Sequence, residues 1–577
     1  MAEASLSRRE WVAPRAPPSG ASAALATSLR LPEPFCRLLL SRDLDDRETI
    51  RRHLRPTLND LHPPDALPDF EAAAVRIESA IESGETILVH GDFDADGMCA
   101  AALLGRGLGE LGARVETFSP HRLRDGYDLS DAGLQRAAEA GATLIVTADC
   151  GVTAIDAVRT AAERGIEVIV TDHHRPAAEL PLAVAVVDPL REDGGYPFSG
   201  LSGVGVALKL LGGLIRRAGG PETARNRHLD LVAIGSIADQ VPLVDENRPL
   251  VAAGLRVLAR TDKAGLRALL AEAGLGGAED LEAEDVAFRI APRLNAVGRM
   301  ADAEAGIRLL ETDDPREAAG LVGQATRGIR RRREVEATVL TAAEAMLAGR
   351  FDPARDGAAV TWGDDWHPGV IGIVASQLVD RFQRPAVVVA FDGDVGRGSC
   401  RSWLDFDVCE ALERLSPLLE RFGGHRQAAG FGIRRANMER FAADFSRLAA
   451  DAAAATERAV PLDVDLVLTL ADVTPDLGKL IRSLGPFGQG NPAPVIVTED
   501  AAVTGISTVG RGGAHLRAEL SDGRGGRLAA FGVGLGPLAA ELGARARWDV
   551  AYELGRNRWN GRSVTQARLL DVRPAAS

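Results

Sequence analysis

The sequence predicts an α/β protein: a doubly wound parallel sheet, a connecting helix, a smaller α/β domain and a small β-barrel. Two observations carry this prediction. Between residues 86 and 188, short apolar runs of strand length alternate with helical stretches, which is typical of a parallel sheet with helices on both faces. Between residues 460 and 575, short alternating strands are separated by glycine-rich turns, which is typical of a small antiparallel barrel.

The patterns divide the chain into five segments. The first 30 residues mix Ala, Pro, Ser and Arg without periodicity, as disordered tails do. A long polar helical stretch with an arginine run predicts a connector between the two α/β domains. The expected segments are a disordered tail at 1–30, the main sheet domain with a helical lead-in at 31–310, the connector helix at 311–350, the smaller α/β domain at 351–458 and the barrel at 459–577.

Composition limits the class of protein. The chain has 577 residues and a net charge of −14, which excludes a histone-like cationic coat but not a nucleic-acid partner for one domain. Its 5 cysteines form no CxxC pair, as expected in a reducing compartment. The N-terminus carries charges where a signal peptide needs an apolar core, and no apolar run is long enough to cross a bilayer. We therefore expect a cytoplasmic protein without a membrane partner.

Acidic residues and histidines stand where the strands of the first sheet are expected to end. The motif HGDFDADG at residues 90–97 places three carboxylates within five residues, and a cation would relieve their repulsion. Later strands end on Asp149 and on Asp172-His173-His174, and an apolar helix ends at Asp239. Each acid alone could cap a helix or a turn. Ligands of parallel sheets bind at the carboxyl ends of the strands, so the set together predicts a site.

The donor types indicate which metal and which chemistry. An EF-hand needs a distant glutamate at a fixed position of its loop, and the motif has none there. An oxygen-rich site with imidazole suits Mn²⁺ or Mg²⁺. Two such metals sharing a carboxylate activate water and hold a phosphoryl group. The residues therefore predict metal-dependent hydrolysis of a phosphoester or phosphoanhydride.

These ordered motifs resemble those of the DHH phosphoesterases, and further motifs resemble the branch of that family formed by single-strand-specific 5′→3′ DNA exonucleases. The resemblance implies a DHH domain, a DHH-associated domain and a C-terminal barrel of the oligonucleotide-binding (OB) fold. The further motifs are IAPRLNAVGRM at 290–300, WHPGVIGIVAS at 366–376, FGGHRQAAG at 422–430 and LGPFGQGNPAP at 484–494.

The resemblance also implies roles for individual residues. Asp149, the expected bridging carboxylate, His174 and Asp94 are the expected catalytic residues, with His174 facing the scissile phosphate as a donor or acid. His90 corresponds to a metal-binding histidine of related pyrophosphatases, and Asp92 is either a ligand or a brace of its loop. The expected metal ligands are Asp94, Asp96, Asp149, His173, Asp239, His90 and Asp92.

A second set of residues is expected to bind phosphate and DNA. A glycine-rich loop around 396–402 could cradle a phosphate through its amides and Arg401, with Cys400 where related sequences have glycine; the alternative is an ordinary strand–turn–strand. A second glycine-rich loop is expected at 423–424. The arginines of the 290–300 motif either contact the 5′-phosphate or fix a domain interface, and His425 either faces the cleft or is buried. The candidates are Arg293, Asn295, Arg299, Ser399, Arg401 and His425.

The resemblance implies an exonuclease that removes mononucleotides from single-stranded DNA in recombination and repair. Residues 501–577 carry 11 Arg against 6 Asp and Glu, so the expected barrel has a basic end for the strand. The expected partners are single-stranded DNA, a single-strand-binding protein and a RecQ-like helicase, and the expected state is a monomer. Two alternatives stay open: a hydrolase of short oligonucleotides, cyclic dinucleotides or polyphosphate, and a non-catalytic DNA-binding scaffold.

Overall fold

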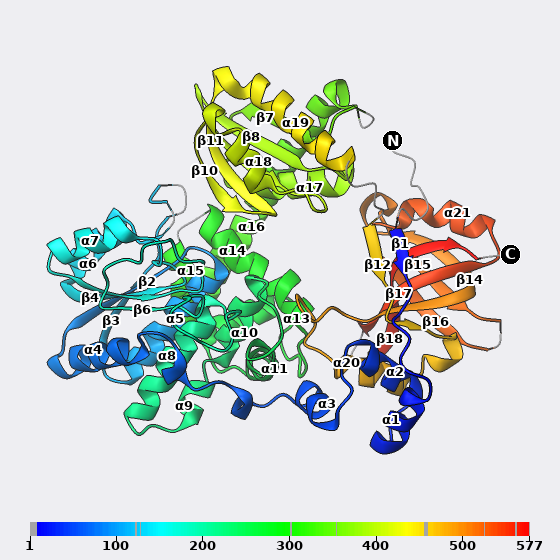
Figure 1. The fold of residues 1–577 in the computed structure, drawn as a ribbon, viewed down its shortest axis with the longest axis horizontal. Helices are drawn as coiled ribbons and strands as arrows, with labels where there is room; N and C mark the ends of the chain where they lie inside the picture. The colour runs from blue at the N-terminus through cyan, green and yellow to red at the C-terminus, as the bar shows by residue number, and fades with distance from the viewer. Residues whose placement is uncertain are drawn as a thin grey trace.

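The protein, described by a computed structural model, has three lobes that each contain a sheet (Figure 1). The first domain is joined to the second by the long helix α16 (Pro315–Arg350), and the barrel lies beside both. Within the part of the chain that the structure describes, no helix is both long and apolar enough to cross a membrane. The described residues are 9–121, 124–126, 128–300, 303–352, 355–454, 460–523, 525–559 and 562–575.

The first domain is built on a 5-stranded parallel sheet in the order β3-β2-β4-β5-β6, which confirms the predicted doubly wound fold. Side chains alternate between two helical layers: Ile87 and Val89 pack into one layer and Leu88 into the other. The strand order reverses between β2 and β4, which opens a crevice at their carboxyl ends. The strands are β2 (Thr86–Gly91), β3 (Arg114–Phe118), β4 (Ala142–Ala148), β5 (Glu167–Thr171) and β6 (Ala185–Val187).

Helices cover both faces of this sheet, and further helices extend the domain toward α16. One face carries α4, α5 and α8, and the other carries α6 and α7. The later helices α10 and α11 pack against each other, and α14 packs on α16. The bounds are α4 (Phe70–Ser83), α5 (Ala95–Glu110), α6 (Asp131–Ala140), α7 (Ile155–Glu163), α8 (Gly203–Arg217), α10 (Leu229–Ala238), α11 (Asn247–Leu258) and α14 (Ala291–Met300).

The second domain corrects the two expected glycine-rich loops, because both are strands. Its sheet has the order β10-β11-β9-β8-β7, and only the β7–β8 pair is parallel. In β9, a Cβ on Gly398 would collide with the ring of Phe431. Glycine is therefore needed here to accommodate the aromatic ring and not to form a turn. Cys400 is fully buried in the same strand. The strands are β7 (Ala359–Asp364), β8 (Ala386–Asp392), β9 (Val395–Arg401), β10 (Leu419–His425) and β11 (Ala428–Arg434).

The C-terminal strands form a closed barrel in the order β14-β15-β16-β18-β17, and β17 pairs back with β14. The closure confirms the predicted OB-type barrel. The expectation of purely antiparallel pairing was wrong for β16 and β18, which pair in parallel. The strands are β14 (Val495–Val509), β15 (His515–Ser521), β16 (Arg527–Gly532), β17 (Trp548–Trp559) and β18 (Arg562–Pro574).

The expected disordered tail is ordered where the structure describes it, from residue 9 onward. Strand β1 (Arg9–Val12) pairs in parallel with β12 (Val460–Asp463), and the Trp11 indole donates a hydrogen bond to Asp571 at 2.7 Å. Helix α1 (Ala21–Leu29) packs on the barrel core. A short segment that becomes ordered by docking on another domain needs no periodic pattern in its own sequence. The missing periodicity was therefore wrongly interpreted as disorder. Residues 1–8 lie outside the described part.

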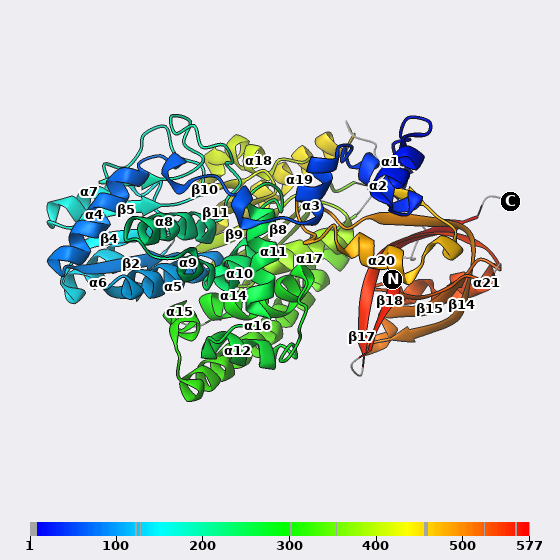
Figure 2. The ribbon, with the colours of Figure 1, turned by 90° about the horizontal axis from the view of Figure 1, so that it is seen from below.

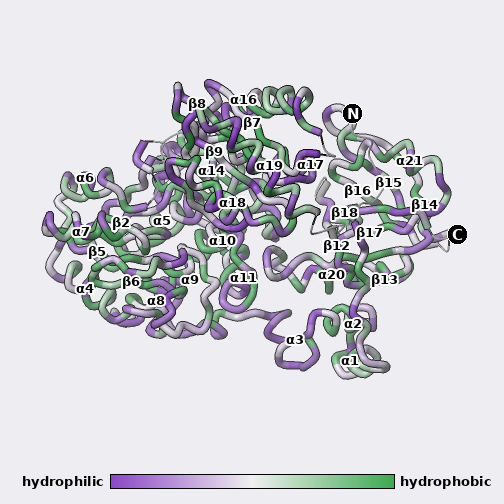
Figure 3. Tube along the Cα trace, turned by 45° about the horizontal axis from the view of Figure 1, so that its top comes forward, coloured by the Kyte–Doolittle hydropathy of each residue, from purple (hydrophilic) through white to green (hydrophobic). Residues whose placement is uncertain are grey.

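The lead-in also differs from the expected arrangement. Helix α2 (Glu33–Ser41) packs on the barrel, and α3 (Arg47–Leu54) is a hydrophilic stretch between the barrel and the first domain (Figure 3). The chain therefore crosses from barrel to first domain before it enters the parallel sheet. The guanidinium of Arg248 fixes this junction, because its Nη2 donates to the carbonyls of His53, Leu484 and Gly485 at 2.7–2.8 Å.

A buried ion pair holds the end of the lead-in on the first domain. The Glu246 carboxylate is fully buried and accepts hydrogen bonds from Lys209 Nζ at 2.6 Å, the Tyr196 hydroxyl at 2.5 Å and the His62 amide at 2.8 Å. Removing one partner of such a pair leaves an uncompensated buried charge, which is strongly destabilising.

We predict that Lys209→Met lowers the free energy of unfolding of the first domain by about 3–5 kcal/mol, because the variant leaves the Glu246 carboxyl buried without its cation. Urea unfolding followed by circular dichroism measures the change. The control is Lys479→Met, since Lys479 pairs with Asp476 on the surface and both side chains are largely exposed. Equal unfolding midpoints for the two variants would contradict the prediction.

Candidate metal centre

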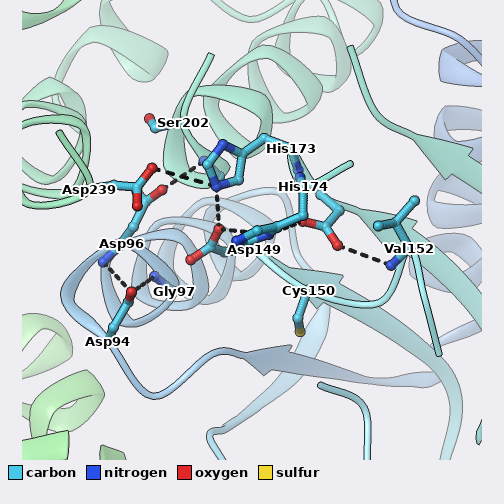
Figure 4. A network of polar contacts seen from close by, with 12 residues as sticks. Asp94, Asp96, Gly97, Asp149, Cys150, Val152, His173, His174, Ser202 and Asp239 are labelled. Carbon is cyan, nitrogen blue, oxygen red and sulfur yellow. Dashed lines mark hydrogen bonds and ion pairs between the residues drawn. The ribbon is translucent and has the colours of Figure 1, made fainter. Parts of the chain in front are cut away.

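The strand-end residues of the first domain meet in one cluster at the crevice between β2 and β4 (Figure 4). His173 follows β5, Asp149 follows β4 and Asp239 follows α10. His173 Nε2 lies 3.0 Å from Asp149 Oδ1 and 3.7 Å from Asp239 Oδ2. Residues far apart in the sequence thus converge because parallel strands end at the same edge.

The orientation of the His173 ring leaves a lone pair and a carboxylate oxygen without hydrogen-bond partners inside the cluster. His173 Nδ1 lies 3.0 Å from the Leu201 carbonyl, which only accepts, so this nitrogen carries the proton. The lone pair of Nε2 therefore faces Asp149. Both His173 Nε2 and Asp149 Oδ1 are buried without a hydrogen-bond partner, despite their short separation. A divalent metal ion between two such donors satisfies both of them.

The carboxylates of the cluster also repel one another. Burial raises the pKa of Asp149, and the neighbouring carboxylates of Asp96 and Asp94 raise it further. Burial and Asp239 raise the pKa of Asp96 in the same way, and the pKa of Asp239 itself rises to about 7. Burial lowers the pKa of His173 to about 4, so its imidazole is neutral and able to ligate. A bound cation reverses the raised carboxylate pKa values.

The donor atoms fall into three overlapping groups whose members lie within 4.8 Å of one another. Asp149 and His173 each belong to two groups, and the backbone of Asp149 has a φ of 67°, which is uncommon outside glycine and often marks a functional position. The groups are Asp149, His173 and His174; Asp96, His173 and Asp239; and Asp92, Asp94 and Asp149.

Helix starts hold the carboxylates of the first motif in place. Asp94 caps α5, because its Oδ1 accepts from the amides of Asp96 and Gly97 at 2.9 and 3.1 Å. Asp96 accepts from the first amides of α8, at 2.7 Å from Gly203. The position of Gly203 requires glycine, because a Cβ there would collide with the carboxylate of Asp149. Partial positive charge at both helix N-termini stabilises these anions.

Asp172 has a role that sequence reasoning missed. Its Oδ1 accepts from the amides of His173 and His174 and lies 2.8 Å from His174 Nδ1. Burial opposes protonation of His174, but the hydrogen bond and charge of Asp172 outweigh it and raise the pKa of His174 to about 9. Asp172 therefore orients the His174 ring and favours its protonated form. The adjacency of an acid and two histidines was the available signal.

His90 does not join the candidate ligands. Its ring is buried against Gly133 of α6, its Nδ1 lies 3.6 Å from Cys150 Sγ, and burial lowers its pKa to about 4. Among the described residues, none of the three donor groups contains it. The ring points to the α6 layer because His90 is still part of β2, one position before the strand ends.

The residues expected to bind phosphate and DNA divide between different places. Asn295 lies at the cluster, since its Oδ1 accepts from the Ala95 amide at 2.9 Å and so braces the start of α5. The Arg293 guanidinium instead donates to the carbonyl of Arg289. The side chain of Arg299 lies outside the described residues. His425 is exposed at the end of β10, an edge strand of the second domain.

Ser399 and Arg401 form a second polar site, on β9 of the second domain. Arg401 Nη1 donates to Ser399 Oγ at 3.0 Å. Its Nη2 lies beside Gly372, at the start of α17 (Ile371–Phe382), where a Cβ would lie 2.8 Å away. A guanidinium, a hydroxyl and a helix N-terminus together favour an anion. We call these residues the Arg401 cradle.

Comparison with known proteins places the chain in a family. The DHH family N-terminal domain matches residues 86–236, the DHHA1 domain matches 355–451 and the RecJ OB domain matches 464–571. The single-stranded-DNA-specific exonuclease RecJ of Bacillus subtilis (strain 168) is 34% identical over 552 residues, which cover 95% of this chain and 69% of that protein.

Solved structures agree with this relationship. The crystal structure of Thermus thermophilus RecJ in complex with Mn²⁺ has a TM-score of 0.83 and 33% identity, and the match covers 99% of this chain and 80% of that chain. The structure of the same protein in complex with Mg²⁺ has a TM-score of 0.76 and 31% identity, and the match covers 99% of this chain and 79% of that chain. The chain therefore belongs to the RecJ family of the DHH proteins.

Proposed function

We propose that this chain is a metal-dependent exonuclease that degrades single-stranded DNA in the 5′→3′ direction and releases mononucleotides in DNA recombination and repair. The observation that carries the proposal is the cluster around Asp149 and His173, whose facing, unpartnered donors fit a divalent cation. A RecJ-family chain that keeps these donors has the means for phosphodiester hydrolysis.

The proposed ligands for Mn²⁺ or Mg²⁺ are oxygen-rich with one neutral imidazole, which is the donor set these ions accept. When bound, the two ions supply Lewis-acid activation of water and stabilise charge on the phosphoryl group. His90 is left out of this set because of its position in the α6 layer. The proposed ligands are Asp92, Asp94, Asp96, Asp149, His173 and Asp239.

The chain's own residues hold the substrate and move the proton. Asp172 fixes the Nδ1 proton of His174, which leaves the Nε2 proton of the imidazolium for the scissile phosphate or the departing oxygen. The Arg401 cradle is proposed to hold a phosphate of the same strand from the second domain. Asn295 keeps the Asp94–Asp96 backbone in register by accepting from Ala95.

The remaining domains and partners form part of the same proposal. The DHH domain, the connector helix, the DHHA1 domain and the OB barrel are the functional units, with residues 9–41 assigned to the barrel on which they pack. A strand-gripping barrel favours a polymer over a dinucleotide or polyphosphate. The sequence has no GxxxxGK[ST] motif for ATP-driven unwinding, so we propose that a RecQ-like helicase unwinds DNA for this chain. We also propose that the chain is a cytoplasmic monomer and that it acts with a single-strand-binding protein.

The polarity of degradation tests the proposal directly. With Mn²⁺ or Mg²⁺, a 5′-labelled single strand should release its label as a mononucleotide at once, whereas a 3′-labelled strand should shorten progressively. The blunt duplex of the same sequence should stay intact, and a chelator should abolish all cleavage. Release of the 3′ label first, or equal turnover of the duplex, would reject the assignment.

Ligand variants test the metal centre. We predict that Asp149→Asn and His173→Ala each reduce exonuclease activity more than about 100-fold, because even the partners of metal ligands are worth about 10–100-fold. Calorimetric titration with MnCl₂ without DNA should show that each variant loses high-affinity binding. Asp188→Asn is the matched control: Asp188 is a buried acid at the end of β6, outside the donor groups, and the variant should keep most of its activity. Unchanged Mn²⁺ binding by the His173 variant would contradict the site.

The Arg401 cradle makes a further prediction. Gly372→Ala raises helix propensity, yet its methyl group would displace Arg401. We expect KM for single-stranded DNA to rise at least about threefold, with no loss of thermal stability, because a charge-assisted contact to phosphate is weakened. Gly320→Ala in α16 is the control, since a Cβ there meets no atom within 4 Å. A KM equal to that of the control would leave the cradle without a role.

A further inference from the structure

Two arginines of the barrel are held by acidic residues of the first domain. Arg556 of β17 donates from Nη1 to Asp280 Oδ2 at 2.7 Å, and its Nη2 lies 3.1 Å from Glu282 Oε1. Arg568 of β18 donates to Glu284 Oε1 at 2.7 Å and, within the barrel, from its Nε to Glu553 Oε2 at 2.9 Å. The contacts between the domains join residues about 280 positions apart, from the last two barrel strands to the start of the short helix α13 (Ala283–Asp285).

These contacts line a cavity of about 1100 Å³ between the first domain and the barrel. Figures 1 and 2 show β17 and β18 on the side of the barrel that faces the first domain. The cavity wall reaches Asn295, which braces the metal centre, and includes Phe531 on the barrel. It also includes Phe288, whose ring is exposed although the chain has few aromatic residues; Phe288 is 73% exposed. Exposed rings and arginines are the surface that a single strand uses.

Arg556 and Arg568 lie where OB folds contact nucleic acid, but carboxylates already neutralise their charge. In OB folds, the loop between the last two strands is one of those that bind oligonucleotides, and Arg556 and Arg568 stand on the two strands that flank it. The side chain of Arg556 is only 13% exposed, and its Nε is buried without a hydrogen-bond partner, so one donor remains for another acceptor. Carboxylates occupy the positions where phosphate oxygens would pair.

We propose that Asp280 and Glu284 stand in for DNA phosphates in the chain without DNA, and that an entering single strand takes Arg556 and Arg568 from them. The inference rests on the proposed function, since it names two phosphate contacts of the same substrate. Asp280 and Glu284 then compete with DNA phosphates for the two arginines, and this competition weakens the binding of short or poorly stacked strands. Between substrates, the same ion pairs hold the barrel against the first domain.

The test measures binding of a fluorescent oligothymidylate by anisotropy, in chelator to prevent cleavage, over a range of KCl concentrations. The acid variant is Asp280→Asn with Glu284→Gln, which keeps Glu282 at the start of α13. Its control is Asp65→Asn with Glu71→Gln, which removes two exposed partners of Arg216 and Arg217 away from the cavity and changes net charge equally. Thermal melting checks that each variant is folded.

We expect the acid variant to bind about threefold to tenfold more tightly than its control, since ion pairs whose carboxylates are largely exposed have modest strength. Its log Kd should depend more steeply on log salt by at most about 1.4, which is about 0.7 for each arginine on a single strand. Glu282 and Glu553 still pair with Arg556 and Arg568 in this variant, so part of the charge stays matched. Arg556→Gln with Arg568→Gln should weaken binding.

A purely structural bridge gives a different pattern, in which the acid and arginine variants both weaken binding, and that result would overturn the inference. Equal affinity of the acid variant and its control would overturn it too. The proposed function fails separately, if the unaltered protein neither binds nor degrades single strands.

Discussion

Mutual repulsion among buried carboxylates is the constraint on which the rest of the molecule depends. Asp96 and Asp149 are buried beside Asp239, and the lone pair of His173 Nε2 faces the same space. Without a cation, burial and neighbouring charge favour protonated carboxyls, and the pKa of Asp239 rises to about 7. A divalent ion at this position would offset the repulsion and turn the unfavourable set into a binding site.

The ordinary features of the fold, strand ends and helix starts, are enough to bring the candidate ligands together. Parallel strands bring their carboxyl ends to one edge, and the reversal of strand order between β2 and β4 opens the crevice there. Helix starts then orient the acids, so Asp94 and Asp96 are helix caps and candidate ligands at once. The second domain carries the Arg401 cradle, and Arg248 ties the barrel to the first domain.

Sequence patterns predicted most of the first domain and of the cluster, because a buried parallel strand that ends on an acid is visible in the chain itself. They failed where tertiary packing decides. Gly398 looked like a loop residue but makes room for Phe431, and the segment around Trp11 orders only by docking on the barrel. The ligand role of His90 was implied by the family resemblance alone, and strand alternation turns its ring toward α6. The contact of Arg556 with Asp280 joins domains, which no local pattern can indicate.

The central claim is that divalent cations satisfy the donors between Asp149 and His173, and anomalous diffraction from crystals grown with Mn²⁺ tests it most directly. The account predicts strong manganese peaks bonded to Asp149, His173 and the neighbouring aspartates, with Asp149 shared between two ions. The contradicting result is a crystal containing Mn²⁺ with no peak in this cluster, in which His173 Nε2 and Asp149 Oδ1 keep their 3.0 Å separation through a shared proton.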